Sequence, residues 1–269
     1  MDWKNKRVIL TGAAGGIGAI AAQQIASQGA RLVLVDLNKA VLLEIAKKLH
    51  ARGYEVHPLA INLTLPTACD SITRFSMQHL GGVDMLINNA GFMSFCAMED
   101  ESNARLDMIC KVNITIPMQL TQHVLPYMQQ HNSGHIINVG STFGSIGQAY
   151  FAAYSASKFA LRGFSEALNR ELADTNICVS YISSRAIKTT FNPSSLYHIA
   201  KATKMNMDEP EVIVQEIIDL ISSKKKISHL GFPESLFARI NGLWPAFIDF
   251  KDKRKNRMMR SYTKEDKNK

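Results

Sequence analysis

The sequence predicts a single three-layer α/β/α domain built on a doubly wound parallel sheet. Short apolar runs rich in β-branched residues alternate with longer segments of helical periodicity as far as residue 231. This alternation is typical of βαβ units, and strands that are apolar throughout indicate burial on both faces of the sheet. The length of 269 residues fits one such domain better than two.

The expected elements follow one another in a regular order. Strands are expected at residues 7–11, 31–36, 54–61, 83–88, 134–141, 177–183 and 227–231. Helices are expected in the stretch that ends at residue 29 and at residues 39–52, 67–80, 102–130 and 152–173. The domain therefore covers residues 1–233, and residues 234–269 form a C-terminal helical extension.

Composition and charge exclude several classes of protein. The chain is 46% hydrophobic and 20% charged, which excludes a disordered protein. It has no uncharged apolar run of about 18 residues to span a membrane and no signal-peptide core. Its four cysteines are scattered, so we expect reduced thiols and a cytoplasmic location. Of the net charge of +8, +6 lies in residues 251–269, and the nearly neutral remainder argues against binding of nucleic acid.

A glycine-rich turn, Thr11-Gly12-Ala13-Ala14-Gly15-Gly16-Ile17-Gly18, joins the first expected strand to the first expected helix. Unpaired N–H groups at a helix N-terminus suit a pyrophosphate, and glycines let the ligand approach closely. Asp36 ends the next strand, where a carboxylate accepts from both ribose hydroxyls of an adenosine and repels a 2′-phosphate. These features predict a Rossmann-type sheet with NAD(H) as the preferred cofactor and NADP(H) as the alternative. A plain strand–helix turn and a helix-capping Asp36 are the simpler interpretations.

Acid–base chemistry is suggested by Tyr154 and Lys158, which are four residues apart in an expected helix and so share one face. A free phenol has a pKa of about 10, and a nearby ammonium lowers it toward the range useful for proton transfer. Ser141 ends an expected strand, where its hydroxyl could donate to a developing oxyanion. An exposed Tyr–Lys pair and an unrelated loop serine are the alternative interpretation.

Taken together, these motifs resemble those of the short-chain dehydrogenases/reductases. The resemblance runs in order over residues 7–190. It is carried by a TGxxxGxG run, an Asn-Asn-Ala-Gly run, a helix asparagine and a Ser–Tyr-x-x-x-Lys set: Thr11, Gly12, Gly16 and Gly18, then Asn88 to Gly91, Asn113, Ser141, Tyr154 and Lys158.

The resemblance implies a role for each matching residue. Tyr154 is the general acid/base, Lys158 lowers its pKa and holds the nicotinamide ribose, and Ser141 polarises the substrate oxygen. Asn113 helps to hold a water that links Lys158 to solvent. The residues implied to bind the cofactor are Thr11, Gly12, Gly16, Ile17, Gly18, Asp36, Asn62, Leu63, Asn89, Ala90, Gly91, Tyr154, Lys158, Ile187 and Thr189. The resemblance also implies a homodimer or homotetramer.

Two positions depart from the family pattern. Asn62 stands where the family usually has aspartate, and an asparagine still contacts adenine. Ser184-Arg185 stands where the family usually has Pro-Gly after the sixth strand. We expect the Arg185 guanidinium to face solvent or the cofactor phosphates and to stay out of the hydride path.

The substrate side of the site is expected to be apolar. Candidate lining residues are Phe92, Met93, Phe95, Phe143, Ile146, Tyr150 and Phe151, with Phe191, Leu196, Tyr197, Met205 and Met207 in the family's mobile flap near residues 190–207. The first group contains no Arg or Lys, so an apolar alcohol or carbonyl substrate fits better than a phosphorylated one. The simpler interpretation is that these aromatics pack beneath the flap. The eight histidines show no ligand spacing, so no metal is expected.

The extension combines an apolar face with a basic stretch. The apolar residues are Leu236, Phe237, Ile240, Leu243, Trp244, Phe247, Ile248 and Phe250, interrupted by Pro245 and followed by basic residues 251–260. This order is typical of a segment that lies on an anionic membrane surface. Docking on the body or on a second subunit, with a solvated charged tail, is the other interpretation.

Two classes of function remain at this point. The leading hypothesis is an oxidoreductase that interconverts an alcohol and a ketone or aldehyde with NAD(P)(H). The rival is a cofactor-binding regulator or scaffold that has lost turnover, suggested by Ser184-Arg185. A nucleic-acid role for the basic tail is weaker, because the tail lacks a folded basic face.

Overall fold

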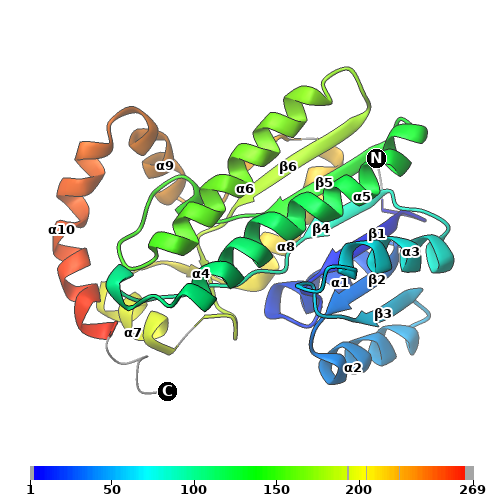
Figure 1. Ribbon diagram of the computed structural model, residues 1–269, viewed down its shortest axis with the longest axis horizontal. Helices are drawn as coiled ribbons and strands as arrows, with labels where there is room; N and C mark the ends of the chain where they lie inside the picture. Colours follow the sequence, from blue (N-terminus) through cyan, green and yellow to red (C-terminus); the bar gives the residue numbers. More distant parts are fainter. Residues whose placement is uncertain (1–2, 193, 204, 224, 264–269) are drawn as a thin grey trace.

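The computed structural model describes residues 3–192, 194–203, 205–223 and 225–263, and its centre is a seven-stranded parallel sheet (Figure 1). The sheet order is β3-β2-β1-β4-β5-β6-β9. Its strands are β1 (Arg7–Thr11), β2 (Arg31–Asp36), β3 (Val56–Ala60), β4 (Met85–Asn88), β5 (Gly134–Val139), β6 (Ile177–Ser183) and β9 (Ile227–His229). The order reverses between β1 and β4, which is where ligands bind in open parallel sheets. The predicted doubly wound sheet is confirmed.

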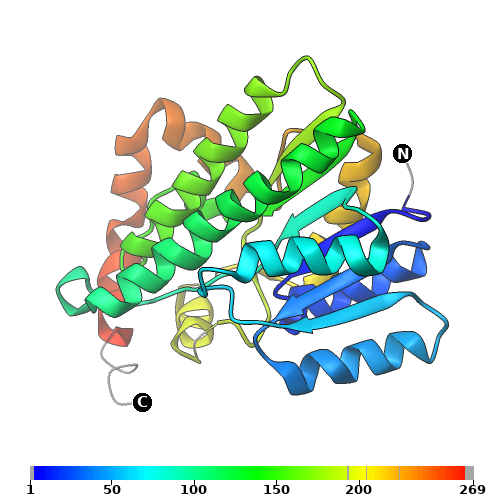
Figure 2. The ribbon, with the colours of Figure 1, turned by 45° about the vertical axis from the view of Figure 1, so that its right-hand side comes forward.

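Helices cover both faces of this sheet, as the apolar strands predict (Figure 2). One face packs against α1 (Gly16–Ser27), α2 (Lys39–His50) and α8 (Pro210–Ser223). The other packs against α3 (Ala68–Leu80), α5 (Ile116–Gln130) and α6 (Ala152–Glu171). Each face buries its own cluster of apolar side chains, so the core lies in two layers on either side of the sheet.

The long helix predicted at residues 102–130 is interrupted. It consists of α4 (Asn103–Cys110), a π-helical turn (Lys111–Thr115) and α5. Such π-turns are frequent at functional sites. Asn113 lies in this turn, 1% exposed, and its side chain bonds to the backbone of Phe92, which explains the break in the regular helix.

The segment after β6 crosses the carboxyl end of the sheet. It contains β7 (Ala186–Ile187), α7 (Ser194–Thr203) and β8 (Met207–Asp208), and β7 pairs with β8 in parallel. The flap expected near residues 190–207 therefore has one helix of its own.

The C-terminal extension forms two helices, α9 (Glu234–Leu243) and α10 (Pro245–Tyr262). Pro245 occupies the first turn of α10, where its missing N–H costs nothing, so the proline starts a helix instead of interrupting one. The predicted basic stretch is part of α10. The side chains of Phe247, Ile248 and Phe250 and all of residues 264–269 lie outside what the structure describes.

Both helices lie at the end of the molecule opposite α2 (Figures 1 and 2). Among the described residues, no helix has the length and apolar character needed to cross a membrane.

Candidate active site

A cavity of about 780 Å³ extends along the carboxyl ends of the strands. This volume falls in the range of about 300–1,000 Å³ that is usual for small-molecule sites. The backbone turns that follow six strands line it, represented by Gly12, Asp36, Ile61, Asn89, Gly140 and Ser184. The sheet thus gathers residues that are far apart in the sequence into one site.

The glycine-rich loop forms one wall of the cavity, where Gly12, Gly15 and Gly16 expose their backbone. A Cβ on Gly12 would lie 2.9 Å from Cα of Ala90, and φ of Gly12 is +67°. A Cβ on Gly16 would lie 2.8 Å from Cγ2 of Thr189. Gly15 at the N-cap of α1, Gly16 and Ile17 line the cavity, so the positive end of the helix dipole meets it there. This wall fits an anionic diphosphate.

Asp36 lies at the cavity and also holds the loop in place. Its Oδ2 accepts from the Ala14 N–H at 2.9 Å, and its Oδ1 accepts from the Asn38 N–H at 2.9 Å. The N-cap of α2 is Asn38, whose side chain accepts from the Val41 N–H, so Asp36 is not that cap. A carboxylate accepts about four hydrogen bonds, which leaves capacity for ribose hydroxyls.

Beyond Asp36, the cavity is lined by Leu37, Asn62, Leu63 and Thr64. The side-chain Oδ1 of Asn62 accepts from the N–H and the hydroxyl of Thr64 at 2.9 and 2.8 Å. The amide nitrogen is therefore the group that Asn62 offers to a ligand. This corner suits a flat base flanked by apolar and amide groups.

Three residues implied by the resemblance do not line the cavity but support those that do. Thr11 accepts at Oγ1 from the N–H groups of Asn89 and Ala90, joining β1 to the loop after β4. A Cβ on Gly18 would lie 2.0 Å from the Gly12 carbonyl oxygen, so Gly18 permits the tight turn. The other residues expected at the cofactor, from Gly12 to Thr189, do line the cavity.

Asn113 is the third residue that supports the cavity wall without lining it. Its amide nitrogen donates to the Phe92 carbonyl at 2.8 Å and to the Ser157 hydroxyl at 2.9 Å, and its Oδ1 accepts from the Phe92 N–H at 2.8 Å. Both amide protons are thus used by the protein. Asn113 therefore ties the Phe92 backbone to the Ser157 hydroxyl, next to Lys158 in α6. Its contact with a relay water stays a prediction.

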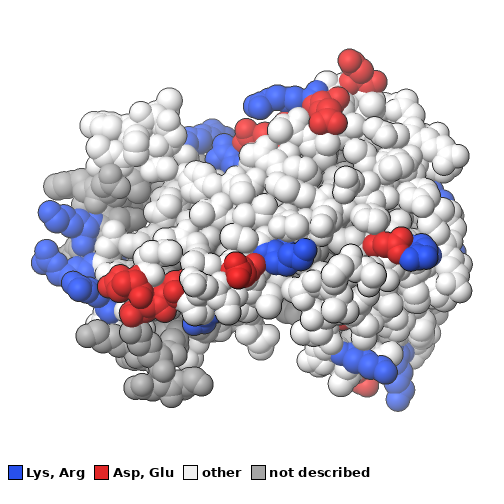
Figure 3. Space-filling view, in the orientation of Figure 1, with Lys and Arg blue, Asp and Glu red and all other residues white. Residues whose placement is uncertain are grey.

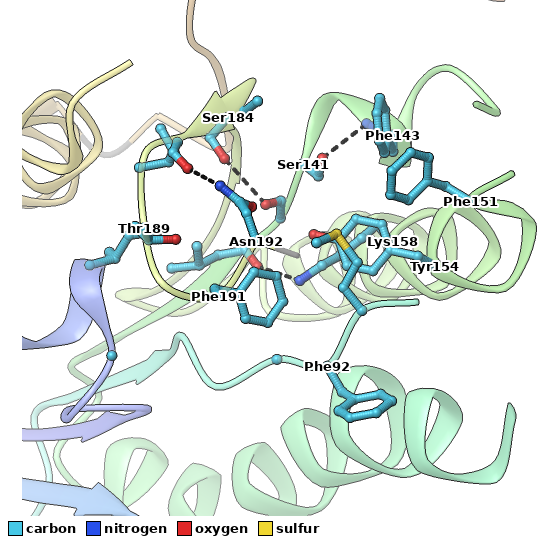
Figure 4. A pocket seen from close by; sticks show the side chains of 18 of the residues that line it. Phe92, Ser141, Phe143, Phe151, Tyr154, Lys158, Ser184, Thr189, Phe191 and Asn192 are labelled. Carbon is cyan, nitrogen blue, oxygen red and sulfur yellow. Dashed lines mark hydrogen bonds between the residues drawn. The ribbon is translucent and has the colours of Figure 1, made fainter. Parts of the chain in front are cut away.

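Tyr154, Lys158 and Ser141 meet at one wall of the cavity (Figure 4). Tyr154 and Lys158 come from the first turns of α6 and are 7% and 5% exposed. Ser141 follows β5 as the N-cap of a short 3₁₀ turn (Thr142–Gly144), and its Oγ accepts from the Phe143 N–H at 3.2 Å. The Ser141 hydroxyl also hydrogen-bonds with Tyr154, so it lies beside the catalytic phenol, where a substrate oxygen would reach both groups.

Burial dominates the protonation of these groups. It raises the pKa of Tyr154 well above its ordinary value, an effect opposed by a hydrogen bond with Ser141. It lowers the pKa of Lys158 to about 8. That the Lys158 ammonium lowers the Tyr154 pKa stays a prediction. Lys158 Nζ donates to the Val139 carbonyl at 3.0 Å, because a buried ammonium needs an acceptor, and lies 5.6 Å from the Tyr154 ring centroid.

The expected substrate wall is largely present. Of the residues predicted to form it, Phe92, Met93, Phe143, Ile146, Phe151, Phe191, Leu196 and Met205 line the cavity. Phe95 instead packs behind Phe151, with ring centroids 4.9 Å apart. Tyr150, Tyr197 and Met207 also lie off the cavity wall, and the Tyr197 hydroxyl donates to the Thr189 carbonyl. The aromatics thus pack beneath the flap and line the cavity at the same time.

The sequence predicts that the Arg185 guanidinium faces solvent or the cofactor phosphates. In the structure its partners are carboxylates instead. It forms a bidentate ion pair with Asp208 and donates to Glu234 at 3.3 Å. The side chain is 20% exposed. Arg185 lines the cavity, and two carboxylates hold its guanidinium there.

The C-terminal extension forms part of the cavity, which the sequence did not indicate. Phe237 of α9 and Lys255 of α10 line it. Gln148 at the cavity donates to the Asn256 side chain at 3.3 Å, and Met259 is fully buried in a cluster with Phe151. The contacts favour the docking interpretation of the extension, and the only sequence signal for them was its apolar periodicity.

No group of three or more His, Cys, Asp or Glu side chains within the described ranges is placed to hold a metal. The four cysteines are free thiols, and burial with the neighbouring Glu101 raises the pKa of Cys96 to about 12. None of these thiols lines the cavity.

Comparison with known proteins agrees with this geometry. The chain is 29% identical over 262 residues to "Estradiol 17-beta-dehydrogenase 11" of Rattus norvegicus, covering 91% of this chain and 87% of the relative. It is 32% identical over 242 residues to "Dehydrogenase/reductase SDR family member 7B" of Bos taurus, covering 86% of this chain and 74% of the relative.

The fold has close counterparts among solved structures. A short chain dehydrogenase/reductase from Burkholderia phymatum, solved in complex with NAD, superposes with a TM-score of 0.83 at 20% identity, over 93% of this chain and 96% of that chain. The family model described as short chain dehydrogenase matches residues 6–198. This chain therefore belongs to the short-chain dehydrogenase family of oxidoreductases, enzymes that act on CH–OH groups.

Proposed function

We propose that this protein interconverts a bulky apolar alcohol and its carbonyl form with NAD(H) as cofactor. The observation that supports this most directly is the position of Tyr154, Ser141 and Lys158 on the wall of a cavity that also contains the glycine-rich N-terminus of α1. The redox partner that fits this N-terminus is a dinucleotide.

Tyr154, Ser141 and Lys158 each have a separate role in the reaction of the CH–OH group. Tyr154 takes the hydroxyl proton during oxidation and returns it during reduction. Ser141 donates a hydrogen bond to the substrate oxygen, while its own oxygen is held by the Phe143 N–H. Lys158, when charged, stabilises the phenolate that forms at Tyr154. A bound nicotinamide supplies the hydride acceptor or donor.

Asp36 supports NAD(H) over NADP(H). Its carboxylate lies at the cavity and already accepts two backbone N–H bonds, which keeps it in place. A 2′-phosphate at this position would meet a fixed negative charge.

An apolar substrate is supported by the aromatic wall beside Tyr154. Phe143 lies 5.2 Å from Phe151 and 6.3 Å from Tyr154, ring centroid to ring centroid, and Phe237 adds a further ring from α9. Four relatives are named for a dehydrogenase of estradiol, a rigid apolar alcohol. A substrate of that class suits this wall.

A rate screen tests the proposal. Purified protein is incubated with NAD or NADP and secondary alcohols of graded size from 2-propanol to estradiol, while reduced nicotinamide is followed by absorbance. We expect rates with NAD to rise with the apolar bulk of the alcohol. Absence of turnover with every alcohol and with the matching ketones would refute the proposal and favour the regulatory alternative.

We also propose that the extension contacts an anionic membrane surface. Leu243 and Trp244, at the junction of α9 and α10, are 88% and 64% exposed. Lys253, Arg257 and Arg260 are exposed at spacings of four and three, and so share one face of α10. Figure 3 shows Lys and Arg side chains gathered over α10 at the left end of the molecule.

A further inference from the structure

Tyr181 is a large polar side chain at a place where the sequence indicates only a buried apolar strand. It lies in β6 and is fully buried, at 0% exposure. Its hydroxyl accepts from the Ser141 N–H at 3.2 Å and donates to the Ser141 carbonyl at 3.1 Å. The Lys158 carbonyl lies 3.4 Å away as an alternative acceptor. One hydroxyl therefore contacts the backbones of two catalytic residues from different elements.

The surroundings of Tyr181 are shaped around its ring. A Cβ on Gly140 would lie 2.1 Å from the ring carbon that carries the hydroxyl. A Cβ on Gly144 would lie 2.1 Å from the hydroxyl oxygen itself. Glycine on either side of Ser141 thus creates the space in which the phenol reaches the backbone.

We propose that Tyr181 is a positioning residue for the reaction, which holds the Ser141 backbone so that its hydroxyl points at the substrate oxygen. This inference rests on the proposed function. Ser141 has an extended backbone (φ −158°, ψ 158°) between β5 and the turn at Thr142–Gly144. Its carbonyl also accepts from the Gly144 N–H at 2.9 Å, and Tyr181 is the side chain that binds its N–H.

The chemistry of the phenol suits this role. Burial raises the pKa of Tyr181 to about 12, so the hydroxyl keeps its proton over the working pH range and remains both donor and acceptor. Phenylalanine fills the same space but neither donates nor accepts. Tyr181→Phe therefore removes the two hydrogen bonds and leaves the packing against Gly140 and Gly144.

A double-mutant cycle tests the proposal, with the full chain, NAD and estradiol as the probe alcohol. We expect Tyr181→Phe to lower kcat about 3–10-fold, the range expected for loss of a typical hydrogen bond, with little change in KM for NAD. In a Ser141→Ala background the same change should lower kcat less than about twofold, because the hydroxyl it positions is absent. Equal losses in both backgrounds would overturn the proposal.

A matched control separates positioning from general destabilisation. Thr73→Val in α3 also removes a buried hydroxyl-to-carbonyl hydrogen bond, from Thr73 to Cys69 at 2.9 Å, far from the cavity. It should leave kcat unchanged. A loss in Thr73→Val as large as in Tyr181→Phe would show that both act through stability alone, and would also overturn the proposal.

A second measurement does not depend on turnover. If the wild type oxidises none of the probe alcohols, the proposed function fails, and amide hydrogen exchange at Ser141 then decides the inference. We expect the Ser141 N–H to be protected in the wild type and to exchange at least about tenfold faster in Tyr181→Phe, as an amide that has lost its acceptor does. An unprotected amide in the wild type, or unchanged exchange in the variant, would overturn it.

Discussion

Arg185 and Asp208 form a bidentate ion pair that fixes the end of β6 against β8. The Arg185 Nε donates to Asp208 Oδ2 at 2.7 Å, and Nη2 donates to Oδ1. Nη1 reaches Glu234 in the first turn of α9 and the Phe232 carbonyl. Arg185 therefore connects the segment after β6 to both the flap and the C-terminal extension.

Removal of this guanidinium should loosen the connection. Arg185→Ala leaves Asp208 and Glu234, which are 11% and 26% exposed, without their shared cation. We expect a loss of about 1–3 kcal/mol in the free energy of unfolding, which corresponds to a fall in Tm of about 2–4 °C per kcal/mol, measured by thermal unfolding. Lys188→Ala, which breaks the exposed pair with Glu209, is the control and should leave Tm unchanged. Equal Tm values for the two variants would contradict the role of Arg185.

Tyr154→Phe should abolish nearly all turnover while cofactor binding survives. The substitution keeps the ring and removes the proton donor, and general acid–base catalysis is worth about 10²–10⁴ in rate. The measurements are kcat for the best probe alcohol and a fluorescence titration with NADH. Tyr150→Phe is the matched control, because Tyr150 lies four residues earlier and does not line the cavity. A Tyr154→Phe enzyme with half the wild-type rate would show that Tyr154 is not the general acid/base.

Asp36→Asn should narrow the preference for NAD. The amide carries no charge to repel a 2′-phosphate, and one of its two atoms can no longer accept from Ala14 or Asn38. The measurement is the ratio of kcat/KM for NAD and NADP. Asn38→Ala is the control, since it removes the cap of α2, at about 1 kcal/mol, without altering the cavity. An unchanged ratio in Asp36→Asn, or a wild type that prefers NADP, would show that Asp36 does not select the cofactor.

Lys158 should make the stability of the cofactor-free protein depend on pH. Burial lowers its pKa from 10.5 to about 8, so between these values the unfolded chain binds more protons than the folded one. The free energy of unfolding then rises with pH across this window, and this contribution is lost as pH falls through 8. Urea denaturation of wild type and Lys158→Met should show a difference that grows by about 3 kcal/mol from pH 8 to 10.5. Parallel pH profiles would mean that Lys158 is not desolvated.

The sequence predicted the glycine-rich loop and the Tyr154–Lys158 pair, because each depends on residues that are close together in the chain. The strand–glycine–helix order around Gly12 and the Tyr154–Lys158 spacing depend on a few neighbouring residues and on the carboxyl end of the sheet, where parallel strands bring their ends together. The β6 strand was also expected from its apolar run. Its burial, however, did not indicate that the Tyr181 hydroxyl would reach the Ser141 backbone 40 residues away.

Contacts over long sequence separations explain what the sequence did not show. Gln148 bonds to Asn256, 108 residues later, and Arg185 bonds to Glu234, 49 residues later. Periodicity identifies an apolar helix face but not the surface that it covers. For the same reason, Arg185 was expected to face solvent or phosphate, since Asp208 and Glu234 become its partners only when the flap and α9 fold over it.

The junction of α9 and α10 should bind anionic vesicles, because Leu243 and Trp244 are exposed beside the basic face of Lys253, Arg257 and Arg260. Each basic residue near an anionic surface contributes about 1 kcal/mol, and insertion of the two apolar side chains adds to this.

We expect the full chain to sediment with vesicles that contain phosphatidylserine at low salt, and much less with phosphatidylcholine vesicles. High salt should weaken the binding, since charges are screened beyond about 8 Å at physiological ionic strength. Leu243→Ser with Trp244→Ser should reduce sedimentation, whereas Leu65→Ser, which changes a 49% exposed residue after β3, should not. Point variants are preferred to truncation because Met259 and Phe237 belong to the buried cluster and the cavity wall. If the wild type does not sediment with phosphatidylserine vesicles at low salt, the proposed membrane contact is wrong. The extension then has only its structural role, as a wall of the cavity.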